Sequence, residues 1–236
     1  TIRNGKFENY YQASVQNHNI AEITGGTFNS VGAEAAILNC GVSRCTVTEK
    51  DAHELIISGG TFSGEIKKTA GGISVTGGTY SDLSAVDYLG DNANVTVELA
   101  ENVTLQSPVD INKGNVVLDL KGKTLSIDKA NSSAVEVNGA KLTINDSNGS
   151  GKIESKQEYG IYALNGGEVI VNAGTIESEY AALTGNNTTG DMNFKVNGGT
   201  LTAKKGPAIY MPGQVELTMT NGILNGGISL RMGQVN

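Results

Sequence analysis

The chain has no tryptophan and only three prolines, and aromatic residues make up 5% of its 236 residues. A conventional globular core depends on large aromatic side chains, so this interior must be built mainly from valine, isoleucine and leucine. The scarcity of proline and a charged fraction of 17% exclude a collagen-like or a disordered chain. No apolar run approaches the roughly 18 residues of a transmembrane helix, so we expect no membrane insertion.

Positive charge is scarce as well, because 17 lysines and arginines face 24 aspartates and glutamates, which gives a net charge of −7. Nucleic-acid binding depends on lysines and arginines that neutralise phosphates, and the nearest approach to a basic cluster is the pairs Lys67–Lys68 and Lys204–Lys205. The same shortage argues against binding to an anionic membrane surface. We therefore expect no nucleic-acid partner.

Only two cysteines occur, Cys40 and Cys45, in the segment CGVSRC. In an oxidising compartment two cysteines this close can form a disulfide; the alternative is two small side chains that fill a loop or the core. A zinc site needs four ligands, and no CxxC motif or paired histidines accompany them. Calcium needs roughly six to eight converging oxygens, and both the EF-hand loop and the RTX nonapeptide are missing. We expect no cofactor, with Ca²⁺ as the alternative.

The chain is rich in glycine, with 32 residues that fall at fixed points of a repeated cassette. The cassette reads apolar, any residue, apolar, Thr/Ser/Asn, Gly, Gly, Thr, apolar. It recurs, with some variation, as AEITGGTF (21–28), LIISGGTF (55–62), ISVTGGTY (73–80), VIVNAGTI (169–176), FKVNGGTL (194–201) and LTMTNGIL (217–224).

Each cassette predicts a strand, a sharp bend and a second short strand. The apolar residues alternate, as in a β-strand, and glycine enters positive φ freely. The residues that we expect at these structural corners are Gly25, Gly26, Gly59, Gly60, Gly77, Gly78, Gly174, Gly198, Gly199 and Gly222.

The spacing of the cassettes predicts the architecture. Gly174, Gly199 and Gly222 follow one another at intervals of 25 and 23 residues, and a third short strand such as YGIYAL (159–164) lies between cassettes. Three short strands in about 23–25 residues make one coil of a parallel β-helix, whose coils stack about 4.8 Å apart. Equivalent residues then form columns, so we expect side chains such as Asn172 and Asn197 to hydrogen-bond along the axis.

The cassettes are less regularly spaced in the first half of the chain, so we divide the chain into two blocks. We predict the end of a first β-helix block over residues 1–90, with a loop insertion at about 29–54, and a second block over 91–236. Residues 81–94, between the two, have helical character and could cover an open coil. The competing interpretation is one continuous helix with a side insertion. Both ends of the chain look cut, so we expect a longer protein or other chains, for example in a trimer, to cap the open coils.

The segments NVVLDLKGKTLSI, KLTINDSNGSGKIES, YGIYALNGGEVIVNAGTIES and VTGGTYSDLSAVDYL resemble repeat regions of large bacterial surface or secreted proteins with pectate-lyase-like β-helices. The resemblance covers nearly the whole chain, and it is specific for coil geometry rather than activity. It implies an all-β, right-handed, single-stranded parallel β-helix. It also implies an extracellular or cell-surface location.

The sequence offers little for catalysis. Glycosidases use two carboxylates about 5 to 10 Å apart, and lyases of this fold use an arginine or lysine base beside acidic residues. The three arginines, Arg3, Arg44 and Arg231, lie away from acidic clusters, the histidines His18 and His53 lie in irregular loops, and polygalacturonase and pectate lyase signatures are absent. The acidic candidates are Asp110, Asp119, Asp128, Asp146, Glu154, Glu158, Glu177 and Glu179, which we interpret as a solvated face with turn-forming aspartates. We therefore expect no catalytic residue and no metal ligand.

A glycan site would need an aromatic platform, and tyrosine is its main candidate. Tyr162, Tyr180 and Tyr210 occupy comparable third-strand segments of successive coils and are expected to form one column, with Tyr159 flanking the first. Pointing outward they form a glycan platform; pointing inward they form a core ladder, and one sequence does not fix this. The favoured function is a non-catalytic, extracellular structural or adhesive module of a bacterial surface protein or a phage fibre. The alternatives are a polysaccharide-binding module and a polysaccharide lyase or hydrolase.

Overall fold

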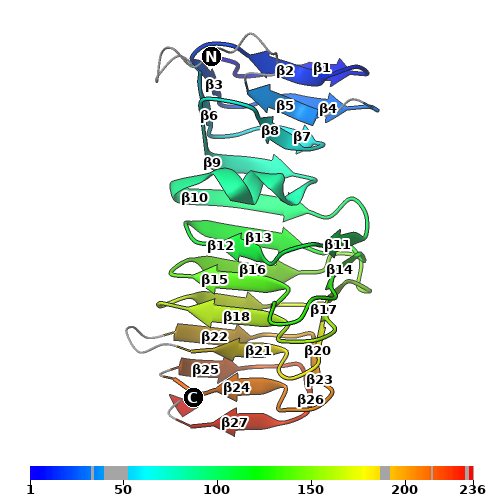
Figure 1. Cartoon of the computed structure of the whole chain (residues 1–236), viewed down its shortest axis with the longest axis vertical. Helices are drawn as coiled ribbons and strands as arrows, with labels where there is room; N and C mark the ends of the chain where they lie inside the picture. Colours follow the sequence, from blue (N-terminus) through cyan, green and yellow to red (C-terminus); the bar gives the residue numbers. More distant parts are fainter. Residues whose placement is uncertain (33–34, 40–52, 187–191, 214, 232–233, 236) are drawn as a thin grey trace. The chain divides into compact units, whose positions relative to one another are not determined.

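The computed structural model describes residues 1–32, 35–39, 53–186, 192–213, 215–231 and 234–235. The chain divides into two compact units, Thr1–Glu98 and Leu99–Asn236. Each unit is a parallel β-solenoid with three short strands per coil, which confirms the predicted fold class (Figure 1). Cys40 and Cys45 lie outside the described residues, so the choice between a disulfide and two small unpaired side chains stays open. No helix among the residues described is long and apolar enough to cross a bilayer.

In unit 1 the three strands of each coil lie in two sheets: two of them belong to a larger sheet and one to a smaller sheet. The larger sheet contains β1 (Lys6–Asn9), β3 (Ala21–Ile23), β4 (Thr27–Ser30), β6 (Glu54–Ile57), β7 (Thr61–Ser63), β9 (Gly72–Tyr80) and β10 (Leu89–Glu98). The smaller sheet contains β2 (Ala13–Asn17), β5 (Ala35–Asn39) and β8 (Ile66–Lys68). Strand β5 falls within the range predicted as a loop insertion, and it pairs with β2 and β8 as a regular coil strand does.

The last apolar residue of each cassette in unit 1 points into the core, where these rings form a stack. Phe7, Phe28, Phe62 and Tyr80 are partners in the strand register, and adjacent ring centroids lie 5.0, 4.9 and 4.9 Å apart with nearly parallel planes. The Tyr80 hydroxyl donates a hydrogen bond to the carbonyl of Gly77 at 2.7 Å, which satisfies a polar group in an apolar interior. Burial raises the pKa of this phenol above its ordinary value.

The two glycines of a cassette have different roles, as Gly59 and Gly60 show. Gly60 has a φ of 115°, which an L side chain rarely adopts, so it makes the bend. Gly59 passes so close to the preceding coil that a Cβ there would lie 2.6 Å from the carbonyl oxygen of Thr24. The same close approach occurs at Gly25, Gly77 and Gly198, and the same positive φ at Gly26, Gly78, Gly174, Gly199 and Gly222.

The helical character expected over residues 81–94 is confined to a 3-10 helix, η1 (Leu83–Tyr88), and β10 follows directly. The hydroxyl of Ser81 accepts a hydrogen bond from the Gly64 N–H, and the hydroxyl of Ser84 accepts one from the Ile66 N–H. Strand β8 is at the edge of the smaller sheet, so these serines satisfy backbone donors that a further strand would otherwise bind.

Unit 2 stacks its coils into three parallel sheets. The first contains β13 (Asn115–Asp119), β16 (Lys141–Asn145), β19 (Glu168–Val171), β22 (Met192–Val196), β25 (Val215–Met219) and β28 (Gln234–Val235). The second contains β11 (Val103–Leu105), β14 (Thr124–Ile127), β17 (Lys152–Ser155), β20 (Thr175–Ser178), β23 (Thr200–Ala203) and β26 (Ile223–Asn225). The third contains β12 (Val109–Ile111), β15 (Val135–Asn138), β18 (Ile161–Leu164), β21 (Leu183–Gly185), β24 (Ile209–Met211) and β27 (Ile228–Leu230).

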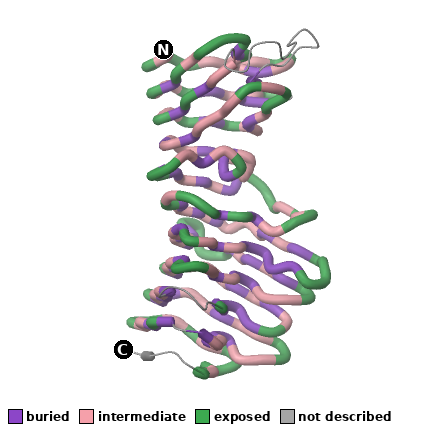
Figure 2. The backbone as a smooth tube through the Cα atoms, turned by 60° about the vertical axis from the view of Figure 1, so that its left-hand side comes forward, coloured by how far each residue is buried: buried purple, intermediate pink, exposed green. Residues whose placement is uncertain are grey.

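Buried and partly exposed residues alternate along these strands, as the period of two predicts (Figure 2). In β19, Val169 and Val171 are buried and Ile170 is not. At the end of this strand Asn172 accepts a hydrogen bond from Asn197, and its own amide donates to Asn145, both at 2.9 Å. Together with Thr220, these asparagines form a ladder whose successive members are 27, 25 and 23 residues apart. The two later intervals agree with the predicted coil length of 23–25 residues, whereas the interval from Asn145 to Asn172 is longer.

Candidate functional site

The third sheet of unit 2 directs two tyrosines outward. In β18 the neighbours of Tyr162 are buried, and in β24 the same is true of the neighbours of Tyr210, whereas both tyrosines remain partly exposed. Because side chains alternate between the two faces of a strand, a buried residue on each side places the tyrosine on the outer face. The structure thus decides the orientation that the sequence left open.

The strand register corrects the predicted tyrosine column. Tyr162 pairs with Thr184, and Thr184 pairs with Tyr210, so a threonine occupies the position expected for Tyr180. Tyr180 lies in the turn before β21 instead, with 43% of its surface exposed. There it meets Tyr159, which lies in the turn before β18.

Tyr159 is the centre of the aromatic group. Its ring stacks on Tyr162, with centroids 5.8 Å apart, and meets Tyr180 edge-on at 6.5 Å. Burial raises the pKa of Tyr159, and the negative charge of Glu158 raises it further. The sequence predicts Tyr159 only beside the platform, and its spacing from Tyr162 in YGIY is the one signal that links the two rings. We call Tyr159, Tyr162, Tyr180 and Tyr210 together the tyrosine face.

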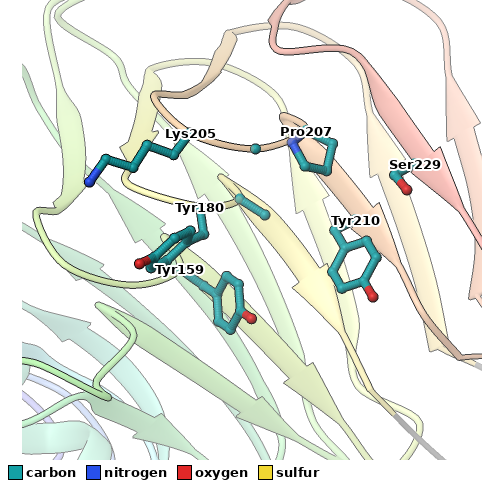
Figure 3. Close-up of a pocket in the computed structure, with 8 residues that line it drawn as sticks. Tyr159, Tyr180, Lys205, Pro207, Tyr210 and Ser229 are labelled. Carbon is teal, nitrogen blue, oxygen red and sulfur yellow. The ribbon is translucent and has the colours of Figure 1, made fainter.

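Two adjoining cavities lie along the tyrosine face and share Tyr159. The first, of about 270 Å³, is the Tyr210 cavity, lined by Tyr159, Tyr180, Lys205, Pro207, Tyr210 and Ser229, among others (Figure 3). In Figure 3 the ring of Tyr159 lies between those of Tyr180 and Tyr210. The Lys205 ammonium contacts a Glu179 carboxylate oxygen at 2.5 Å. The cavity therefore combines aromatic surface with an ion pair and a hydroxyl.

The second is the Glu136 cavity, of about 260 Å³, which includes Tyr159, Tyr162, Glu136, Glu158, Asn131 and Ser133 in its lining. Glu136 pairs in register with Tyr162 on one side and with Asp110 on the other. Burial raises the pKa of Glu136, and the nearby negative charge of Asp110 raises it further. The outward column of the third sheet thus runs from carboxylates to tyrosines.

Most of the other acidic residues named as candidates in the sequence have ion-pair or hydrogen-bond partners. On the second sheet Glu177 binds Lys204 at 2.8 Å, and Lys152 bridges Glu177 to Glu154. Asp128 contacts Lys156 at 3.5 Å. Asp119, at the end of β13, accepts backbone hydrogen bonds from Lys121 and Ser147, and Asp146, which follows β16, accepts them from Gly122 and Gly151.

The charged side chains that line the two cavities are Glu136, Glu158 and Lys205. The residues that line the two cavities include neither a histidine nor an arginine, and their lysine, Lys205, is engaged by Glu179. Among the residues that the structure describes, no group of three or more His, Cys, Asp or Glu side chains is arranged to hold a metal ion. The arrangement is suited to binding: rings for apolar contact, and carboxylate, amide and hydroxyl groups for hydrogen bonds.

The fold defines this chain as a parallel β-solenoid. Comparison with protein-family models, curated proteins and solved structures gives no match. The tyrosine face is therefore the feature from which a function is inferred.

Proposed function

We propose that this chain is a non-catalytic polysaccharide-binding module and that it belongs to an extracellular or cell-surface protein. The observation that carries the proposal is the tyrosine face, where four partly exposed rings and two cavities lie along one side of the solenoid. The location is supported by the resemblance of the repeats to those of bacterial surface proteins.

Tyrosine rings and polar groups alternate here in the way that a sugar requires. A pyranose presents apolar C–H faces, which pack on aromatic rings, and a rim of hydroxyls, which need hydrogen-bond partners. Coils repeat about every 4.8 Å, a rise similar to that of one sugar in an extended chain. A polysaccharide running along the axis would meet Tyr162 and Tyr210, which are two coils apart, at every second sugar.

The solenoid holds these rings in place before any ligand binds. The asparagine ladder at Asn172 and the ion pairs around Glu177 link successive coils, and the tyrosines project from strands or from the turns next to them. A binding surface that is already ordered loses less conformational entropy on association. This rigidity supports an adhesive role, in which the module presents a fixed surface to a glycan.

The test measures binding of the full chain to a panel of soluble polysaccharides by affinity electrophoresis, followed by titration calorimetry. We expect Tyr162→Ala and Tyr210→Ala each to weaken binding about 3- to 10-fold. The matched controls are Tyr10→Ala and Tyr11→Ala, since these tyrosines are 69% and 81% exposed in unit 1. Absence of binding across the panel, or equal losses in the control variants, would contradict the proposal.

The same polysaccharides test whether the module is non-catalytic. We expect no new reducing ends and no unsaturated products after prolonged incubation. Products that disappear in a Glu136→Gln variant would instead establish the lyase or hydrolase alternative, because Glu136 is a partly buried carboxyl with the raised pKa that a general acid needs.

A further inference from the structure

The Glu136 cavity differs from the rest of the solenoid surface in its charge. Three carboxylates gather at or beside it: Glu136 and Glu158 in its lining, and Asp110 next to Glu136 in the register. No ion pair joins these three to a lysine or arginine among the residues described. Four other glutamates of unit 2 do have such partners: Glu154, Glu168, Glu177 and Glu179.

The contrast with the other two sheets is direct. Glu168 on the first sheet lies between Lys141 at 3.2 Å and Lys195 at 3.3 Å. On the second sheet Glu177 lies between Lys152 and Lys204. In both columns a lysine from a neighbouring coil neutralises the carboxylate, whereas in the third-sheet column the neighbours of Glu136 are another carboxylate and a tyrosine.

A bound cation would supply the missing charge. Partial burial disfavours the ionised form of Glu136, and the adjacent carboxylate of Asp110 adds to this cost, so the pKa of Glu136 is raised. An ammonium group placed among them gains charge-assisted hydrogen bonds and removes the repulsion. The rings of Tyr159 and Tyr162 line the same cavity, and aromatic faces attract ammonium groups.

The size and chemistry of the cavity indicate what kind of cation fits. The carboxylates are not arranged as a metal site in the described part of the chain. The cavity, of about 260 Å³, also offers aromatic surface and the polar groups of Asn131 and Ser133, which suit a sugar ring. The cavity thus suits a ring that carries both hydroxyls and a positive charge.

We infer that the Glu136 cavity is a subsite for a cationic amino sugar, a pyranose with a free ammonium group, within the bound polysaccharide. This inference rests on the proposed function and adds the substrate class: a polysaccharide with unacetylated amino sugars. The ammonium group lies between Glu136 and Glu158, and its ring packs on Tyr159 and Tyr162. The neighbouring sugars occupy the Tyr210 cavity.

The test uses three oligosaccharides of equal length and the same β-1,4 linkage: glucosamine, N-acetylglucosamine and glucose oligomers. Titration calorimetry at about pH 6 keeps ordinary carboxyls ionised and the amines protonated. We expect the glucosamine oligomer to bind at least about 10-fold more tightly than either neutral oligomer. Glu136→Gln and Glu158→Gln should each reduce this ratio several-fold.

The matched control is Glu154→Gln, which changes the net charge equally but lies on the second sheet, in contact with Lys152. We expect it to leave the ratio unchanged. Equal affinity for all three oligomers would overturn the amino-sugar subsite while the proposed function stands. An unchanged ratio in both cavity variants would also overturn it, because the preference would then come from overall charge. No binding of any oligomer or polysaccharide would overturn the proposed function itself.

Discussion

The ring stack in unit 1 allows a quantitative prediction for Phe62. Its side chain is 1% exposed, and its ring lies between those of Phe28 and Tyr80 at centroid distances of 4.9 Å. Replacement of a buried phenylalanine by alanine costs about 3 to 5 kcal/mol. Each aromatic contact contributes about 0.5 to 1.5 kcal/mol beyond area burial, so Phe62→Leu, which keeps most of the apolar volume, should cost about 1 to 3 kcal/mol.

Phe7 provides the matched control, because it belongs to the same stack but is only partly buried and has one ring partner in it, Phe28. Phe7→Leu should therefore lower the free energy of unfolding by less than half as much as Phe62→Leu. The chain contains no tryptophan, so urea unfolding is followed by far-UV circular dichroism. Hydrogen exchange in β4, β7 and β9 then assigns the loss to unit 1. A cost below about 0.5 kcal/mol for Phe62→Leu, or equal costs at both positions, would refute the reasoning.

Two further predictions concern the corners of the coils. Gly60→Val should lower the free energy of unfolding by about 1 to 3 kcal/mol in a urea titration, since its φ is 115°, whereas Thr61→Ala, at an exposed position, should change it by less than about 0.5 kcal/mol. For Asp119, burial would raise the pKa, but the N–H donors of Ser147 and Lys121 and other favourable contacts outweigh it and hold the pKa below its ordinary value. The ionised form therefore stabilises the fold above the unfolded pKa of about 4, and this contribution is lost as the pH falls through the lower folded value. At pH 7 the Asp119→Asn variant should have a free energy of unfolding about 1 kcal/mol lower than that of the parent chain. Unfolding titrations at decreasing pH should show this difference shrinking. A difference that stays constant with pH would contradict a stabilising role for the ionised Asp119.

The glycines of the cassette show where sequence reasoning stops. Both glycines of each pair were predicted as corners, on the ground that glycine enters positive φ. That reason holds for Gly60, but Gly59 is constrained by the carbonyl of Thr24 on the preceding coil. The first property belongs to one residue and can be predicted locally. The second depends on a neighbour more than thirty residues away, which only the stacked coils bring close.

The helical segment and the tyrosines were each predicted in part. Helical character was expected up to Asn94, but η1 ends at Tyr88, where the chain returns to a strand. The tyrosines were identified from their positions in successive third-strand segments. Their outward direction needed the burial of both strand neighbours, and the meeting of Tyr159 with Tyr180 needed the geometry of two turns.

The sequence by itself determined the solenoid, because alternation of apolar residues, glycine bends and a recurring cassette are properties of short segments. Only the tertiary structure decided which outward side chains become neighbours. Coils of 27, 25 and 23 residues differ in turn length, so the register between strands cannot be counted from the repeat alone. That register sets Asp110 beside Glu136 and Glu136 beside Tyr162, and it places Thr184 where Tyr180 was expected. The candidate binding face exists because coils stack directly on one another, so distant residues meet across about 4.8 Å.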